Sequence, residues 1–204
     1  MHRILLPIFL ACLLASCASS TPRAPSLRGL SLRDKTALVS DPDPSVRLNA
    51  LQSLASDARK ASPPVRSGII QLFTDRLSVE PAPLLRQSLV SALSALARPR
   101  ALPAYLKALE DDSPTVRLEA VHALRDASDP AALEPLRRSL ASDPDDRVRA
   151  DALSAYVSLA DPDDATVLLQ GVIRDPSDAV AIRARSELAR LMKKTPNAPR
   201  PAQP

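Results

Sequence analysis

A sequence repeat of about 32 residues occurs five times along the chain and constrains its fold more than any other feature. Each copy has an acidic residue, then in most copies a proline, and five residues after the acid an apolar residue, usually valine. The apolar position is held by Val46, Leu85, Val116, Val148 and Val180, at spacings of 39, 31, 32 and 32 residues. Self-similarity at such a period predicts a solenoid, whose units bury their apolar faces against one another.

Each unit is predicted to contain two helices. Prolines suit the first position of the first helix at Pro44, Pro83 and Pro114, and short polar residues suit its N-cap at Asp43, Ser113, Asp145 and Ser177. Apolar residues follow the shared position at +4, +5 and +8, which is the spacing of a helical stripe and not of a strand. The second helix is opened by Pro99, Asp129 and Asp161 in successive units, and it has its own apolar stripe.

The pattern therefore predicts an all-α fold, an α-solenoid of about five stacked helical hairpins over residues 31–193. The second helix of the first hairpin is longer, roughly Val65 to Leu77, which accounts for the 39-residue spacing. A single helix near Leu32 to Val39 is expected before it. Helices this short are marginal in water alone, so stability is expected to come from stacking.

The N-terminus reads as an export signal. A positive charge at Arg3 precedes an apolar stretch from Ile4 to Leu14 and small residues before Cys17, so residues 1–16 are predicted to be a signal peptide. That stretch is short for a membrane span. Cys12 and Cys17 are the two cysteines of the chain, so the mature protein has no disulfide or cysteine-based zinc site available.

Two segments outside the repeats are expected to lack fixed structure. Residues 17–30 are rich in Ser, Pro, Ala and Arg and are predicted to form a flexible tether. Residues 194–204 contain four prolines and are predicted to form a disordered tail.

The segment Leu14-Ala15-Ser16-Cys17 resembles the bacterial lipobox. The resemblance implies that Cys17 is acylated and becomes the N-terminus of a lipoprotein, and multiple acyl chains anchor stably where a single chain does not. Because Ala18 and not Asp follows Cys17, resemblance to Gram-negative sorting rules implies the periplasmic face of the outer membrane. An ordinary signal peptide with an incidental Cys17 is the alternative.

The repeat itself is similar to a known family. The stretch from Asp111 to Leu124, with Asp129 to Leu136 after it, resembles the short bacterial HEAT-like repeat, also called the phycobilisome-lyase repeat. The resemblance implies the stacked fold, and the family name suggests a bilin lyase-like activity on a protein substrate. The chain departs from the repeat pattern at Leu85, Ala181 and Arg137; an atypical last unit is expected of a cap.

Charged residues recur with the repeat. Arginines at Arg47, Arg86, Arg117 and Arg149 allow two interpretations, a ladder that binds a ligand or an internal network with the acids of successive helix starts, and the second is favoured. Paired acids such as Asp111 and Asp112 are interpreted as helix caps, with Ca²⁺ binding as the alternative. A net charge of +4 without runs of five like charges is not typical of nucleic-acid binding.

A candidate binding surface lies on the second helices of the hairpins, which in HEAT-like stacks line the concave side. Lys107 and Arg138 occupy corresponding positions there, and Arg137 and Arg174 lie near them. These four residues form a partly basic stripe that would suit an acidic protein partner, whereas a solvated face without a partner is the alternative.

No catalytic, cofactor-binding or metal-binding residues are identified. His122 is the one histidine beyond the leader, and it is expected to stand isolated on the polar side of a helix. The three glycines form no phosphate-binding loop and no Gly-x-Ser-x-Gly elbow. The sequence therefore predicts a non-enzymatic, membrane-anchored lipoprotein scaffold that binds a partner protein in the cell envelope, and a bilin lyase-like enzyme or enzyme subunit is the alternative.

Overall fold

The computed structural model describes residue 27 and residues 29–194. Residues 1–26, 28 and 195–204, which hold Cys17, the predicted leader, most of the predicted tether and nearly all of the predicted tail, lie outside the described residues. The described residues form ten α-helices and two 3₁₀ turns and contain no strand. In chain order these are α1 (Leu32–Leu38), α2 (Pro44–Lys60), α3 (Pro63–Val79), α4 (Pro83–Ala97), η1 (Arg98–Ala101), α5 (Leu102–Ala108), α6 (Pro114–Ala127), η2 (Pro130–Ala132), α7 (Leu133–Ser142), α8 (Asp146–Leu159), α9 (Pro162–Val172) and α10 (Asp178–Lys194).

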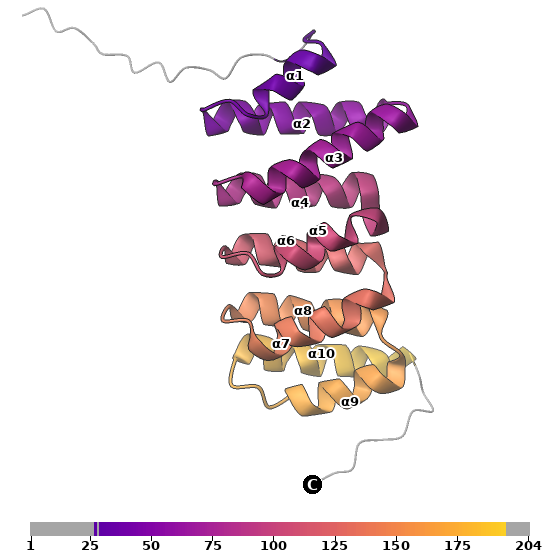
Figure 1. Cartoon of the computed structure of the whole chain (residues 1–204). Coiled ribbons are helices and arrows are strands. Elements are labelled where there is room, and N and C mark those ends of the chain that lie inside the picture. The colour runs from indigo at the N-terminus through magenta and orange to yellow at the C-terminus, as the bar shows by residue number, and fades with distance from the viewer. Residues whose placement is uncertain (1–26, 28, 195–204) are drawn as a thin grey trace, which may run out of the picture.

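The helices form two layers (Figure 1). One layer contains the first helix of each unit, α2, α4, α6, α8 and α10, here called the A helices, and the other contains the second helices α3, α5, α7 and α9, here called the B helices. The A helices α4, α6, α8 and α10 each pack on the A helix before them. The predicted all-α solenoid is confirmed, with α1 as a single helix at its start. The fifth unit has α10 alone, because the described residues end with that helix.

Proline sets where the A helices begin. Pro44, Pro83 and Pro114 are the first residues of α2, α4 and α6, as predicted, because a first helical residue has no intrahelical partner for its N–H. Asp43 caps α2 by accepting a hydrogen bond from the N–H of Ser45 at 2.8 Å. Ser113 stands at the N-cap of α6 without capping it through its side chain.

The units are linked at two opposite edges (Figure 1). At the A-to-B junctions, α4 and α6 end at residues with positive φ, 44° at Arg98 and 53° at Ser128. Positive φ reverses the chain direction at a helix end and is usually left to glycine. Prolines follow at Pro99 and Pro130 inside the two 3₁₀ turns, which lead into α5 and α7.

The core is a continuous apolar seam between the layers. The predicted stripe residues Leu54, Leu93 and Leu124 at position +8 are fully buried, as is Val116 at the shared apolar position. The B helices contribute their own buried residues, Phe73, Tyr105, Leu136 and Leu169. Because every unit adds to this seam, no unit holds a core of its own.

Packing also involves Leu27, a residue of the predicted tether. Leu27 was expected in the flexible segment, but only 8% of it is exposed and it belongs to the core. Helix α1 is held by an ion pair between Lys35 Nζ and Asp57 Oδ2 on α2, at 2.6 Å. Burial of Leu27 before α1, together with the ion pair from α1 to α2, holds this single helix over the start of the stack.

Leu124→Ala is expected to lower the free energy of unfolding by about 2–5 kcal/mol, because Leu124 is fully buried and the neighbouring units cannot collapse into the space it leaves. The matched control is Leu84→Ala, since Leu84 on α4 is 60% exposed; its effect should stay within about 0.5 kcal/mol. Urea denaturation followed by circular dichroism measures both. Equal losses for the two variants would contradict the observed helix faces.

Candidate functional site

Arginine side chains tie each unit to the next at the B-to-A junctions. Arg117 of α6 donates from Nε to Asp143 Oδ2 at 2.8 Å and from Nη2 to Asp143 Oδ1 at 2.9 Å. Its third nitrogen, Nη1, donates to the backbone carbonyls of Asp111 at 2.9 Å and Asp112 at 3.2 Å. One guanidinium therefore binds both the carboxylate of the following unit and the turn of its own unit. Lysine, with a single ammonium group, could not make this bidentate contact.

Each acid of this ladder has a second role. Asp143 Oδ1 also accepts the N–H of Asp145 at 2.9 Å, which shapes the turn into α8. The same arrangement joins Arg47 to Glu80 and Arg86 to Asp111. We call these residues the arginine ladder, namely Arg47, Arg86, Arg117 and Arg149 with their acidic partners Glu80, Asp111, Asp143 and Asp175.

The ladder is an internal network, as the favoured interpretation of the sequence held, and its arginines are committed to the fold. It weakens at the C-terminal end, where Arg149 Nη2 lies 3.9 Å from Asp175 Oδ1. Ala181 takes the place of the next arginine. Asp111 and Asp112, interpreted from the sequence as helix caps, both pair with Arg86, and the N-cap position of α6 is held by Ser113. Among the described residues, no group of His, Cys, Asp and Glu side chains could hold a metal ion.

Pairing with arginine lowers the pKa of two ladder acids, Asp111 and Glu80. Burial alone would raise the pKa of Asp111, but hydrogen bonds from Arg86 and from the Ser113 N–H outweigh it and hold that pKa below its ordinary value of 3.8. Burial of Glu80 is likewise outweighed by hydrogen bonds from Arg47, from the Ala82 N–H and from Arg76, and its pKa lies below 4.5. Glu80 and Asp111 therefore stay charged at neutral pH.

Two crevices open between the B helices beside the ladder. The first crevice, between α3 and α5, has a volume of about 550 Å³; Thr74 and Lys107 line it, with Arg86 also among its lining residues. The second crevice, between α5 and α7, has a volume of about 470 Å³ and is lined by Leu109 and Arg138, among others. Helix α5 is a wall of both crevices, so they are neighbours along the B face.

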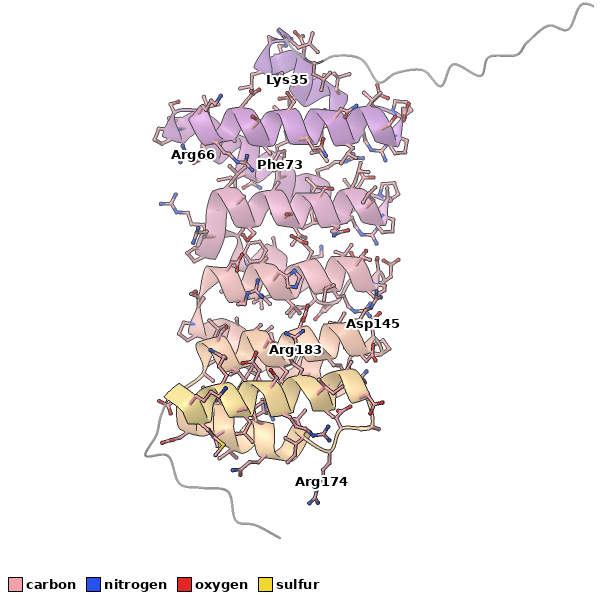
Figure 2. The ribbon with its side chains drawn as sticks, turned by 180° about the vertical axis from the view of Figure 1, so that it is seen from behind. Lys35, Arg66, Phe73, Asp145, Arg174 and Arg183 are labelled. Carbon is pink, nitrogen blue, oxygen red and sulfur yellow. The ribbon has the colours of Figure 1, made fainter. Side chains whose placement is uncertain are left out.

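The structure separates the four predicted partner-binding residues. Lys107 lines the first crevice and Arg138 the second, and both are exposed without an ion pair to any described carboxylate. Arg137 is engaged by Glu134, with 2.8 Å between Nε and Oε2. Arg174 lies at the far end of the stack and projects away from it (Figure 2). Two of the four residues are therefore brought into adjacent crevices, and the other two are not.

Sequence reasoning missed Glu110, which lines both crevices. Glu110 lies two residues after the end of α5, and its presence makes the lining of mixed charge and not purely basic. Its place in the repeat is the signal that could have indicated it. The residue just before the acid that begins each unit is exposed in all five units, namely Ser40, Val79, Glu110, Ser142 and Arg174.

His122 is not the isolated histidine that the sequence suggested. Its Nε2 lies 3.0 Å from Asp151 Oδ2 on α8, and Asp151 Oδ1 lies 3.5 Å from Arg183 Nη2 on α10. This polar row connects three A helices across the face opposite the crevices. It resembles a structural bridge, because the Asp151 carboxylate is shared between His122 and Arg183, and Arg183 also donates from Nη1 to Ser154 Oγ at 3.2 Å.

One further polar group stands in the core. Tyr105 on α5 is fully buried, and its hydroxyl has no hydrogen-bond partner among the described residues. Burial raises the pKa of this phenol, so it stays neutral. The Tyr105 ring fills the space between layers beneath the crevices' common wall, and its hydroxyl does not line either of them.

Comparison with known proteins decides the type of repeat. Residues 70–157, from α3 to α8, match the family of HEAT repeats. The chain carries HEAT-like repeats. No curated protein matches the sequence significantly. None of the described helices is both long and apolar enough to span a bilayer.

Solved HEAT-like and armadillo structures share the fold at low sequence identity. The complex of CpcE and CpcF of phycocyanin lyase from Nostoc sp. PCC7120 has a TM-score of 0.61 at 21% identity, covering 85% of this chain and 68% of that chain. A designed armadillo repeat protein in complex with the peptide (KR)4 has a TM-score of 0.53 at 17% identity, covering 84% and 94%. At such identities the likeness establishes the HEAT-like solenoid fold alone.

Arg117→Ala is expected to destabilise the HEAT-like stack by roughly 3 kcal/mol, because it leaves the buried Asp143 carboxylate without its guanidinium. The expected loss is at the low end of what breaking a buried ion pair costs, because 11% of the Arg117 side chain is exposed to solvent. Arg149→Ala is the matched control, because its contact with Asp175 is 3.9 Å long, and it should cost clearly less. Chemical denaturation measures both, and a larger loss for Arg149→Ala would contradict the assigned roles.

Proposed function

We propose that this protein is a non-catalytic, lipid-anchored scaffold that binds a partner protein in the cell envelope through the B face of its HEAT-like repeats. The observation that carries the binding part is the pair of adjacent crevices, each with one exposed cation, Lys107 or Arg138, that no described carboxylate neutralises. Repeat solenoids present extended surfaces of this kind to their partners.

The crevices specify what the partner must offer. A partner segment would place one acidic side chain opposite Lys107 and a second opposite Arg138, one repeat further along the stack. Glu110, on the wall between them, favours a hydrogen-bond donor or a cation of the partner at the intervening position. Opposite charges matched across a surface give specificity more than affinity. Arg137 and Arg174 would contribute at the margin.

The lipid anchor rests on the sequence. The segment Leu14-Ala15-Ser16-Cys17 supports acylation of Cys17, and Ala18 supports the periplasmic face of the outer membrane as the location. An anchored stack would display its crevices to envelope proteins while remaining attached to the membrane.

Cys17→Ser is expected to remove the protein from the membrane fraction of cells, because serine offers no thiol for acylation. Mass spectrometry of the N-terminal peptide should find acyl chains on Cys17 in the wild type. Cys12→Ser is the matched control and should change neither result. An unmodified Cys17 in the mature wild-type protein would refute the anchor and leave the binding surface to be judged separately.

Lys107→Glu combined with Arg138→Glu is expected to abolish most partner capture, because it places like charges where the partner carries acids. Proximity labelling in the native envelope identifies the captured proteins, and a pull-down compares the variants. Arg137→Glu is the matched control and should reduce capture much less, since Glu134 already occupies Arg137. Undiminished capture by the double variant, at unchanged thermal stability, would exclude the crevices.

The alternative is an enzyme or enzyme subunit of the bilin lyase-like HEAT-repeat class. The shared fold of the CpcE and CpcF complex supports it. A chromophore-transfer assay with a bilin and an acceptor protein distinguishes the two functions, because a scaffold without catalytic groups should transfer no pigment.

A further inference from the structure

Positive charge collects at one edge of the first two units. The residues are Arg59 and Lys60 at the end of α2, Arg66 in the first turn of α3, and Arg98 and Arg100 in η1, here called the basic edge. Four of them are exposed and Arg66 is half-buried. None forms an ion pair with a carboxylate among the described residues. The nearby acid Asp57 is already paired with Lys35.

The basic edge is held rigidly. Arg66 donates from Nε to the carbonyl of Ala58 at 3.0 Å and from Nη2 to the carbonyls of Arg59 and Ala61, each at 3.3 Å. These neutral carbonyls close the end of α2 and leave the charge of Arg66 uncompensated. Prolines at 63, 64 and 99 stiffen the two junctions. The cations are therefore presented by fixed backbone.

Helix-end stabilisation accounts for only part of this arrangement. Cations in the last turn of α2 favour that helix through its dipole, which suits Arg59 and Lys60. Arg98, however, has a φ of 44°, a conformation that glycine adopts without cost. An arginine at a position where the backbone favours glycine is consistent with a role of its charge beyond stability.

The unpaired cations are most numerous at the start of the stack. At the next A-to-B junction Arg125 is paired with Asp126, with 3.4 Å between Nε and Oδ1. At the junction between α8 and α9 the exposed residues are the acids Asp161, Asp163 and Asp164. Near the end of α10, Lys193 is exposed. The uncompensated positive edge thus belongs to the units nearest the predicted lipid anchor.

We infer that the basic edge docks on the anionic phospholipid headgroups of the membrane that holds the anchor. The inference rests in part on the proposed acylation of Cys17, which lies ten residues before Leu27. Ten residues span at most about 36 Å, so the first two units stay close to the headgroups. Long basic side chains on a protruding edge suit a plane of lipid phosphates, and Val65 among them, 38% exposed, adds apolar contact.

The test uses the full lipidated protein, inserted by its own anchor into vesicles of phosphatidylcholine with or without phosphatidylglycerol. A fluorescent probe on Ser62→Cys at the basic edge reports approach to a quencher on the lipid headgroups. The matched control is the same probe on Ser40→Cys, which is exposed at the opposite edge of the same unit. Quenching of the Ser62 probe should rise with phosphatidylglycerol, and the Ser40 probe should not respond.

The rise should disappear at ~0.5 M salt, where exposed charges interact over only about 4–5 Å before screening suppresses them. It should also disappear in a variant that combines Lys60→Glu with Arg100→Glu, both exposed, while the melting temperature stays unchanged. Equal quenching of the two probes, or a lack of dependence on phosphatidylglycerol, would overturn the inference. Salt-sensitive capture of an acidic protein by this edge, without lipid dependence, would also overturn it.

Failure of the anchor is distinguishable from failure of the edge. If mass spectrometry finds Cys17 without acyl chains, the anchor is refuted, and the same protein is then tested by flotation with the two kinds of vesicle. Flotation with phosphatidylglycerol vesicles alone, lost in the Lys60→Glu and Arg100→Glu variant, would still support the edge. Absence of flotation with either vesicle would refute the edge as well.

Discussion

The bidentate pairing of an arginine in one unit with an acid in the next is the interaction on which the geometry of this solenoid depends. Apolar contacts between units are non-directional and would tolerate sliding of one hairpin on another. The guanidinium of Arg117 does not, because it must meet both Asp143 oxygens while its third nitrogen holds the carbonyls of Asp111 and Asp112. A buried pair of this kind contributes register more securely than it contributes stability.

Fixing the register at one edge fixes the rest of the molecule. The acids that pair with the arginines also accept backbone N–H groups in the turns that precede the A helices. The position of each B helix relative to the next unit is therefore fixed at its C-terminal end. Lys107 and Arg138 are thereby carried into neighbouring crevices, although nothing in their own contacts places them there. The ladder weakens toward α10, because Arg149 Nη2 lies 3.9 Å from Asp175 Oδ1 and Ala181 stands where the next arginine would be.

The sequence predicted the features that repeat and missed those that depend on a single unit. Helix starts at Pro44, Pro83 and Pro114, the buried stripe and the internal ladder all followed from the period, because each is stated several times in the chain. The burial of Leu27, the pairing of His122 with Asp151 and the engagement of Arg137 by Glu134 occur once each. They depend on how neighbouring units meet, which a local pattern does not encode. The sequence also did not predict how charge is divided between the two edges, because the net charge of +4 is a sum over the whole chain.

The two proposed surfaces are compatible because they belong to different sides of the stack. The basic edge lies at the A-to-B junctions, whereas the crevices lie on the B face, beside the opposite junctions where the ladder runs. A stack resting on headgroups by its A-to-B edge would therefore keep the crevices open toward the aqueous side. Arg66, which locks the first junction, would keep that edge from yielding as the units approach the bilayer. The ladder would hold the remaining units in register, so that the binding face moves with the docked edge as one body.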